Sequence, residues 1–359
     1  MTRFACAFIL VVTALLSPLV FAAALAADPP RVMVTAVTET EPVDADPDDP
    51  AIWINTDNPA QSRVIGTDKQ YGLLVFDLDG KIVQRLPDGK LNNVDIRQDV
   101  DLGGSKVTLV AASKREDNTI VLYTVAADGT LQHATPFAFP GALRDIEDDI
   151  YGIGLHVAAD GIPQVIVNFK TGDVVQWAVA ADATGQLSLT LLREWTVPSQ
   201  PEGIVADDEL GFIYVGEENG GIWRFEADPQ KPAEGVQIDL VGSACLATDD
   251  VEGLTIYKTG PQTGYLVASS QGDNSYALYE RQPNEAGEQS CIGSFSIGTG
   301  ATDPVGETDG LDVTALPLGP LYPQGLLAVQ DDRNEGFTRN FKFVSWQEVT
   351  KALNLGIAE

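Results

Sequence analysis

A repeat of roughly fifty residues is the feature that most constrains how this chain can fold. Six times an acidic residue opens a short apolar strand, and six times a polar turn follows the next strand. The acidic positions are Asp48, Asp95, Asp149, Glu202, Glu252 and Asp309, and the turn positions are Lys69, Arg115, Lys170, Glu217, Gln271 and Asp331. Six strand-rich units of this length predict a six-bladed β-propeller, although common acid–glycine turns could also produce such a series by coincidence.

The runs between these positions have the composition of β-strands. β-Branched and aromatic residues alternate with polar ones, and Gly, Asp and Asn turns separate the runs. The expected strands include Val107–Ser113, Thr119–Val125, Gln164–Phe169, Phe212–Gly216, Ile222–Phe225 and Tyr265–Ser269. A convincing helical pattern occurs only near the end, from Ser345 to Leu353. The chain is therefore predicted to be all-β, and the strand Arg31–Glu39 is expected to close the ring by pairing with the last blade.

The composition excludes some classes of function. The chain has 359 residues, with 22 Lys and Arg against 52 Asp and Glu, and thus a formal net charge of −30. So acidic a chain repels nucleic acid phosphates, and no nucleic acid partner is expected. Because 44% of the residues are hydrophobic, the acidity is not that of a disordered tail. Two histidines do not suffice for a histidine-rich metal centre.

The first 27 residues have the pattern of a secretory signal peptide. Arg3 supplies a positive charge, an apolar stretch runs from Phe4 to Val20, and Ala24-Leu25-Ala26 matches a small-residue cleavage pattern. The alternative is a membrane anchor, but no later run reaches the roughly 18 apolar residues of a membrane span. We therefore expect a secreted or periplasmic protein with a single domain at 28–359, no membrane partner, and a net charge of 21 − 52 = −31 after cleavage.

Two cysteines, Cys245 and Cys291, remain after cleavage. In an oxidising compartment a disulfide between them is the leading interpretation, and two separately buried thiols are the alternative.

In a propeller, positions that recur once per blade lie on one ring around the axis. The acidic series would therefore gather carboxylates, and the turn series would place Lys69, Arg115 and Lys170 beside acids and amides. Carboxylates this close repel each other unless cations lie among them. Oxygen ligands without His or Cys favour Ca²⁺ over Mg²⁺. The sequence thus predicts a site for several calcium ions, with a solvated acidic surface as the alternative.

Several strings also match one known family in order and spacing. They are Asp48-Asp49-Pro50-Ala51-Ile52-Trp53, Gly66-Thr67-Asp68-Lys69, Leu91-Asn92-Asn93-Val94-Asp95-Ile96-Arg97, Glu252-Gly253-Leu254-Thr255-Ile256-Tyr257, Ala268-Ser269-Ser270-Gln271-Gly272, Tyr276–Arg281 and Thr308-Asp309-Gly310-Leu311-Asp312-Val313. In these strings the chain strongly resembles the β-propeller phytases, the calcium-dependent alkaline phytases, from about Arg31 to the C-terminus. The resemblance implies a phosphoric monoester hydrolase of the 3-phytase type, which acts on phytate (myo-inositol hexakisphosphate) or calcium-phytate.

The resemblance also implies roles for individual residues. The implied calcium ligands are Asp48, Asp49, Glu202, Glu217, Asp250, Glu252, Asp303, Asp309 and Asp331. The implied catalytic residues are Glu202, Glu217, Asp250, Glu252, Lys69, Arg115 and Tyr151. The implied substrate-binding residues are Lys69, Asn92, Asn93, Asp95, Arg115, Tyr151 and Lys170. The chain departs from the family pattern at Glu218-Asn219-Gly220-Gly221, which leaves the number of calcium ions at the centre open. It also departs at Asp332-Arg333-Asn334-Glu335, which leaves the peripheral calcium site open.

The expected reaction is hydrolysis of phytate by metal-activated water, which releases inorganic phosphate and lower inositol phosphates. Lys69, Arg115 and Lys170 would hold phosphates through charge-assisted hydrogen bonds. His133 and His156 are expected to have structural roles, and the chain is expected to be a monomer. Six-bladed propellers also serve as lactonases or as non-catalytic binding scaffolds, so these two functions are the alternatives.

Overall fold

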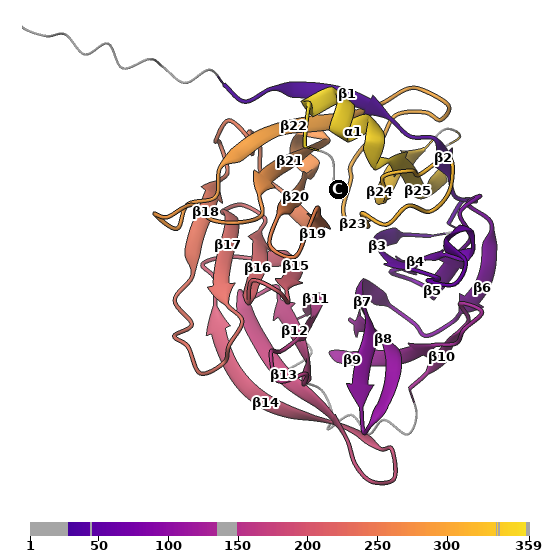
Figure 1. Cartoon of the computed structure of the whole chain (residues 1–359), viewed down its shortest axis with the longest axis vertical. Helices are drawn as coiled ribbons and strands as arrows, with labels where there is room; N and C mark the ends of the chain where they lie inside the picture. The colour runs from indigo at the N-terminus through magenta and orange to yellow at the C-terminus, as the bar shows by residue number, and fades with distance from the viewer. Residues whose placement is uncertain (1–27, 44, 135–148, 335, 337, 357–359) are drawn as a thin grey trace, which may run out of the picture.

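The computed structural model describes residues 28–43, 45–134, 149–334, 336 and 338–356, and the predicted signal peptide lies outside this part of the chain. Consecutive strands pair antiparallel within each sheet, because every apolar run ends at a turn that returns the chain beside itself. Six such sheets surround a common centre (Figure 1). The all-β prediction and the six-bladed β-propeller are confirmed.

The blades follow one another along the chain. Blade 1 comprises β3 (Pro47–Trp53), β4 (Arg63–Asp68), β5 (Gly72–Phe76) and β6 (Ile82–Leu86). Blade 2 comprises β7 (Leu91–Leu102), β8 (Ser105–Lys114), β9 (Thr119–Val125) and β10 (Leu131–His133). Blade 3 comprises β11 (Ile150–Val157), β12 (Pro163–Phe169), β13 (Asp173–Ala181) and β14 (Leu187–Thr196).

The second half of the ring is built in the same way. Blade 4 comprises β15 (Pro201–Asp207), β16 (Phe212–Glu217), β17 (Gly221–Glu226) and β18 (Val236–Leu240). Blade 5 comprises β19 (Val251–Lys258), β20 (Gly264–Ser270), β21 (Ser275–Glu280) and β22 (Cys291–Gly298). Blade 6 comprises β23 (Leu311–Val313), β24 (Leu326–Asn334) and β25 (Thr338–Ser345). Short 3₁₀ turns occur at Pro59–Gln61 and Gln271–Asp273.

The first strand of each blade lies nearest the centre of the ring (Figure 1). Each of these six strands contacts the first strand of the next blade, and β23 of blade 6 contacts β3 of blade 1. Residues about fifty positions apart in sequence are therefore neighbours around the axis, which is the geometry that a functional site at the centre requires.

Apolar side chains fill the space between neighbouring sheets. Ile65 and Val75 of blade 1 share one buried cluster with Val110 and Tyr123 of blade 2. Since both faces of a blade are covered, an inner strand such as β5 (Gly72–Phe76) is buried at every position and has no polar alternation.

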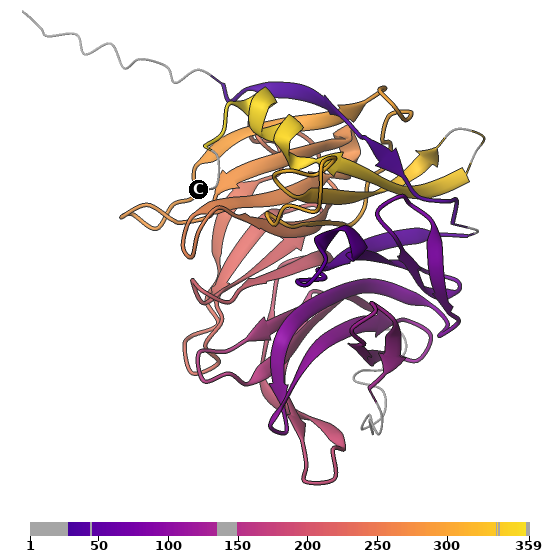
Figure 2. The ribbon, with the colours of Figure 1, turned by 45° about the vertical axis from the view of Figure 1, so that its right-hand side comes forward.

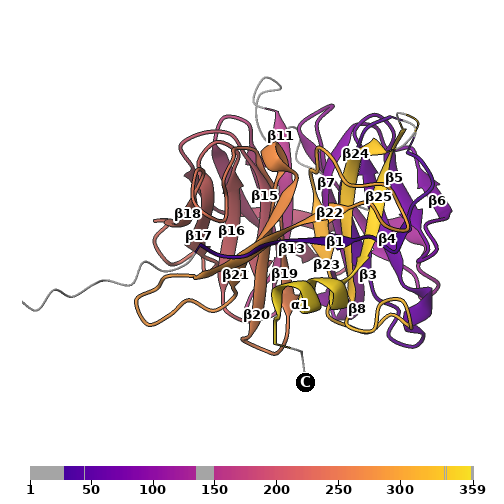
Figure 3. The ribbon, with the colours of Figure 1, turned by 90° about the horizontal axis from the view of Figure 1, so that it is seen from above.

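The N-terminal segment closes the ring in a more complex way than predicted. β2 (Thr38–Glu39) pairs antiparallel with β25 and becomes the outer strand of the last blade, as expected. β1 (Arg31–Thr35) instead pairs parallel with β22, the outer strand of blade 5. The prediction that Arg31–Glu39 forms one strand of the last blade is therefore wrong for its first half. The segment holds blades 5 and 6 together from outside, as its indigo ribbon shows in Figures 2 and 3.

The predicted C-terminal helix is confirmed as α1 (Trp346–Leu353), which follows β25. Its buried residues include Trp346 and Val349, and the Trp346 ring stacks on Tyr257 of blade 5 with 4.2 Å between ring centres. Within the described part of the chain, none of the helices is long and apolar enough to cross a membrane.

A disulfide joins Cys245, in the connection between blades 4 and 5, to Cys291 at the start of β22, with 6.3 Å between the two Cα atoms. The predicted disulfide is therefore present, and the alternative of two separate thiols is not. It ties the inter-blade connection to the outer strand of blade 5.

Candidate active site

The first strands carry a bulge at the same place in successive blades. In β3, Pro47 pairs with Asp68 and Pro50 with Gly66, so two residues of β3 oppose a single residue of β4. The same break in register occurs in β7, β11, β15 and β19. In β23 the pair Leu311–Val329 marks the same position. We call the first bulged residue of each blade, with its counterpart in blade 6, the axial ring: Asp48, Asn92, Tyr151, Glu202, Glu252 and Asp309.

This register corrects the predicted acidic series in two blades. Asp95 lies three residues after Asn92, and Asp149 lies two residues before Tyr151. The repeat length located each blade, but loops of different lengths separate the strands, so the spacing alone could not fix the register to a single residue. The sequence predicted a ring made mostly of carboxylates. In the structure the amide of Asn92 and the phenol of Tyr151 take the places of two of them.

A second ring follows the second strand of each blade. The backbone N–H of Lys69 donates to the Asp46 carbonyl at 2.8 Å, and the same bond recurs in the next four blades. We call these donors, with their counterpart in blade 6, the mouth ring: Lys69, Arg115, Lys170, Glu218, Gln271 and Asp332. The predicted turn series is thus displaced by one residue in blade 4, where it named Glu217, and in blade 6, where it named Asp331.

Carboxylates of three residues come together at the centre. One oxygen each of Glu202, Glu218 and Glu252 lies within 4.8 Å of the others, and all three side chains are buried. We call these three residues the acid cluster. The Asn92 amide donates to Glu202 Oε1 at 2.9 Å and holds that carboxylate from the blade 2 side. Glu218 was missing from the predicted site, because the sequence does not show which residue of the Glu217-Glu218 pair makes the repeated turn bond.

Two more carboxylates border the acid cluster through Lys69. Lys69 Nζ lies 3.0 Å from Asp48 Oδ1 and 3.5 Å from Asp309 Oδ2. The other oxygen of Asp48, Oδ2, is buried without a hydrogen-bond partner in the described part of the chain, and so is Glu252 Oε2. Buried acceptors without a donor are expected where a cation binds. The donor set is entirely oxygen, which suits Ca²⁺.

The electrostatics of these carboxyl groups also favour a cation. Burial, together with the charge of Asp48, raises the pKa of Glu202 to about 7. Burial and the neighbouring Glu202 raise the pKa of Glu252 well above its ordinary value, and burial and Asp48 do the same for Asp309. These carboxyls therefore resist ionisation even though Lys69 lies near Glu202 and Asp309, and a bound divalent cation would reverse that preference.

Cationic side chains from blades 2 and 3 gather around Tyr151. Arg115 lies 5.4 Å and Lys170 Nζ 4.3 Å from the centre of the Tyr151 ring. Arg115 also donates to Asp149 Oδ2 at 2.9 Å and to Asn92 Oδ1 at 3.3 Å. Burial, followed by the charges of Glu202 and Glu252, raises the pKa of Tyr151, so its phenol stays protonated as a hydrogen-bond donor.

A cavity of about 250 Å³ opens between these groups. Residues from five blades line it, among them Lys69, Tyr151, Glu202, Glu252 and Asp309. The site thus combines buried carboxylates that suit a divalent cation with basic side chains that suit an anion.

Comparison with known proteins decides the family. A family model described as phytase matches residues 2–357 of the chain. A 3-phytase of Bacillus subtilis (strain 168) is 41% identical over 332 residues, which cover 89% of this chain and 85% of that protein. The chain belongs to the β-propeller phytase family. A crystal structure of BBS1N in complex with ARL6DN, soaked with lead, matches 79% of this chain and 74% of that chain with a TM-score of 0.42 and 12% identity. Nothing about function follows from that last likeness.

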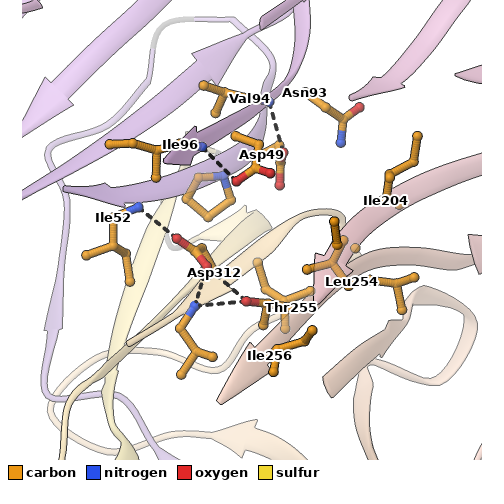
Figure 4. A pocket seen from close by; sticks show the side chains of 18 of the residues that line it. Asp49, Ile52, Asn93, Val94, Ile96, Ile204, Leu254, Thr255, Ile256 and Asp312 are labelled. Atoms are coloured by element: carbon orange, nitrogen blue, oxygen red, sulfur yellow. Dashed lines mark hydrogen bonds between the residues drawn. The ribbon is translucent and has the colours of Figure 1, made fainter. Parts of the chain in front are cut away.

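In this phytase-family chain, Asp95 does not join the acid cluster. It lines a second cavity of about 300 Å³, part of which is drawn in Figure 4. The two cavities share no lining residue. Asp95 Oδ2 accepts the Leu155 N–H at 2.7 Å, and both of its carboxylate oxygens lie 3.0 Å from Arg97 Nη1. Asn93 lines the same cavity and accepts a 2.7 Å bond from the Asn92 amide. The substrate-binding roles of Asp95 and Asn93 stay predictions.

Asp49 also faces this second cavity, where Figure 4 shows its carboxylate beside Val94. Its Oδ2 accepts the Val94 N–H at 3.0 Å, and burial raises its pKa well above the ordinary value. The bond links blade 1 to blade 2, so Asp49 has a structural partner whether or not it also binds a metal ion.

Glu217 and Asp250 lie next to the acid cluster without joining the three residues that form it. Glu217 accepts hydrogen bonds from Ser199 Oγ and, at 2.7 Å, from Trp223 Nε1. The Asp250 backbone N–H donates to the Glu218 carbonyl at 2.9 Å, and burial followed by the charge of Asp249 raises the Asp250 pKa. Asp250 is thus linked directly to Glu218 through the backbone. The roles of Glu217 and Asp250 as metal ligands stay predictions.

Asp303 and Asp331 meet elsewhere, around the fully buried ammonium of Lys342. Lys342 Nζ pairs with Asp303 and Glu39, lies 3.4 Å from Asp331 Oδ2 and donates to Asn334 Oδ1 at 2.9 Å. A metal ion at these carboxylates would have to share them with a lysine, so the oxygen donors here fit a calcium ion less well than those of the acid cluster.

Proposed function

We propose that this protein is a calcium-dependent phytase that hydrolyses phosphate monoesters of phytate to inorganic phosphate and lower inositol phosphates. One observation carries the proposal: the central cavity is lined by Glu202 and Glu252 of the acid cluster, by Lys69, and by Tyr151, whose ring Arg115 and Lys170 contact. Membership of the phytase family and the identity to a 3-phytase support the choice of substrate.

The basic residues would bind the substrate. Phytate carries many negative charges, and a chain of net charge −30 repels it over most of its surface. Lys69, Arg115 and Lys170 supply local positive charge for phosphate oxygens through charge-assisted hydrogen bonds. Tyr151 would donate a hydrogen bond from its phenol O–H to a phosphate oxygen. Both Arg115 and Lys170 contact the Tyr151 ring.

The acid cluster would hold calcium. Its three members, Glu202, Glu218 and Glu252, bring one carboxylate oxygen each within 4.8 Å of the others. Asp48 and Asp309, which both contact Lys69, add carboxylates at the border of the cluster. When bound, calcium would neutralise these carboxylates, bind phosphate oxygens and activate water for attack on phosphorus. Asn92 orients Glu202, and the burial of the cluster keeps competing water away from its carboxylates.

Phosphate release from phytate tests the proposal directly. The purified protein should release phosphate when calcium is present and lose this activity in excess chelator. Glu252→Gln keeps the side-chain shape but removes a charge, and we expect kcat to fall at least about 100-fold. Hydrolysis of a sugar lactone without phosphate release would instead identify a lactonase, and the absence of both activities would favour a binding scaffold.

We also propose that the protein works outside the cytoplasm. The pattern of a cleavable signal in residues 1–27 and the Cys245–Cys291 disulfide support this, since stable disulfides belong to oxidising compartments. Mass spectrometry of the protein from the periplasm or culture medium of its host should find a chain that lacks residues 1–27. A full-length chain in the cytosol would contradict the proposal.

A further inference from the structure

Polar side chains in the second strands bind the backbone of the axial ring. Ser113 Oγ in β8 accepts the Asn93 N–H of its own blade and donates to the Tyr151 carbonyl of the next blade at 2.5 Å. Ser269 Oγ in β20 accepts the Gly253 N–H and donates to the Asp309 carbonyl, both at 2.7 Å. Each serine therefore links the bulge of one blade to the axial ring residue of the next.

Asn168 makes the same link between blades 3 and 4 with its two amide atoms. Its Oδ1 accepts the Gly152 N–H and its Nδ2 donates to the Glu202 carbonyl, both at 2.7 Å. The side chain is fully buried, so no water competes for these bonds. The two first strands approach so closely here that a Cβ on Gly152 would lie 1.8 Å from the Glu202 carbonyl oxygen.

These contacts occupy one position of the repeat, two residues before the mouth ring. Blade 4 has Gly216 there and thus no polar side chain, and in blade 1 the Thr67 hydroxyl returns to Asp49 of its own blade. In blade 6 Gln330 reaches the Pro47 carbonyl, one residue short of the axial ring. The links that end on the axial ring thus hold Tyr151, Glu202 and Asp309, which all line the central cavity.

We propose that Ser113, Asn168 and Ser269 are positioning residues that fix the axial ring around the central cavity and so set the geometry of the metal and phosphate groups. The inference rests on the proposed function, and Asn168 gives its sharpest form because Glu202 belongs to the acid cluster. Without the Nδ2 bond the Glu202 carbonyl loses its partner from blade 3. The Asn92 bond would still orient the carboxylate, but the Glu202 backbone would be held less tightly relative to Glu252.

Three variants of the full chain test the role of Asn168. Asn168→Ala removes both bonds, whereas Asn168→Ser restores the hydroxyl that Ser113 and Ser269 use in their blades. Gln176→Ala is the matched control, because Gln176 is equally buried in blade 3 and donates to the Ala227 carbonyl of blade 4 at 3.0 Å, but belongs to the third strand β13. Calcium affinity by isothermal titration calorimetry and steady-state kinetics on phytate are the readouts, with melting temperature measured for each variant.

We expect Asn168→Ala to lower kcat about tenfold or more and to weaken calcium binding several-fold, since small displacements of reacting groups are costly. Asn168→Ser should stay within about threefold of the wild type, and Gln176→Ala should lower the melting temperature while kcat and calcium affinity change less than about twofold. Unchanged kcat and calcium affinity in a folded Asn168→Ala chain would overturn the inference, and so would equal losses in Gln176→Ala. If the wild type binds calcium but releases no phosphate, the proposed function fails while the calcium affinities still decide the role of Asn168.

Discussion

Glu217 and Glu218 are adjacent in sequence, yet their carboxylates have different partners. Glu217 ends β16 and accepts bonds from Ser199 and Trp223, whereas Glu218 opens the turn and faces Glu202 and Glu252. The difference arises because Glu217 is the last residue of the strand, whereas Glu218 lies in the turn, where its backbone N–H donates to the Gln200 carbonyl. At the scale of the residue, the structure therefore assigns the central position to Glu218.

Charge removal at these two positions should have unequal effects. Glu218→Gln should lower kcat at least tenfold and reduce the rise in melting temperature that calcium produces, because a ligand charge is lost. Glu217→Gln keeps an acceptor oxygen for Trp223 Nε1, and its amide N–H can donate to Ser199 Oγ, so kcat should change less than about threefold. Kinetics and thermal melts with and without calcium measure both. A larger loss in Glu217→Gln would return the ligand role to Glu217.

At the scale of the element, the N-terminal segment closes the propeller partly through a buried charge. Glu39 of β2 lies opposite Lys342 of β25 and pairs with it. Lys342 also pairs with Asp331 of blade 6 and with Asp303, which lies in the segment before that blade. The attraction of these acids raises the Lys342 pKa although burial alone would lower it. The ammonium thus neutralises carboxylates that would otherwise repel one another at the join between the first and last parts of the chain.

Lys342→Met should therefore destabilise the protein. The substitution keeps most of the side-chain volume but leaves buried carboxylates without their counter-ion, which costs about 3 kcal/mol. Urea unfolding in chelator measures the loss, and Lys351→Met, at an exposed lysine of α1, is the control with little expected change. If Lys342→Met is as stable as the control, the buried ion pairs do not hold the closure together.

At the scale of the whole molecule, the acid cluster opposes folding when no cation is bound. The ordinary Glu pKa is 4.5, and burial raises the pKa of Glu202 to about 7 and that of Glu252 well above its ordinary value. The folded state thus holds protons that the unfolded state has released in this pH range. A raised carboxyl pKa makes the folded state less stable as pH rises through that window. Calcium, which binds the ionised form, should remove this penalty.

Thermal melts across pH 5 to 8 test this balance. In excess chelator the melting temperature should fall as pH rises towards and through about 7, where Glu202 loses its proton. With calcium the fall should be absent, and the calcium-dependent difference should grow with pH because metal and proton compete for the same oxygens. Carboxyls with a lowered pKa, such as Asp128, titrate below this range. A melting temperature in chelator that rises steadily from pH 5 to 8 would contradict the prediction.

The all-β class, the six repeats, the C-terminal helix and the residue types available for a site could all be predicted from the sequence. These depend on local composition and on period, which a sequence displays directly. Lys69, Glu252 and Asp309 could be located from motif strings, Glu202 from the repeat, and Tyr151 from the family resemblance, and all five residues line the central cavity.

Which residue of each blade faces the axis could be learned only from the three-dimensional structure. A bulge adds one unpaired residue to a strand and loops vary in length, so the repeat could not distinguish Asn92 from Asp95 or Glu218 from Glu217. The split of the N-terminal segment between two blades and the link from Asn168 to Glu202 depend likewise on contacts between distant strands. Such contacts leave no periodic trace in the sequence, because they are set by register and by the distance between blades rather than by composition.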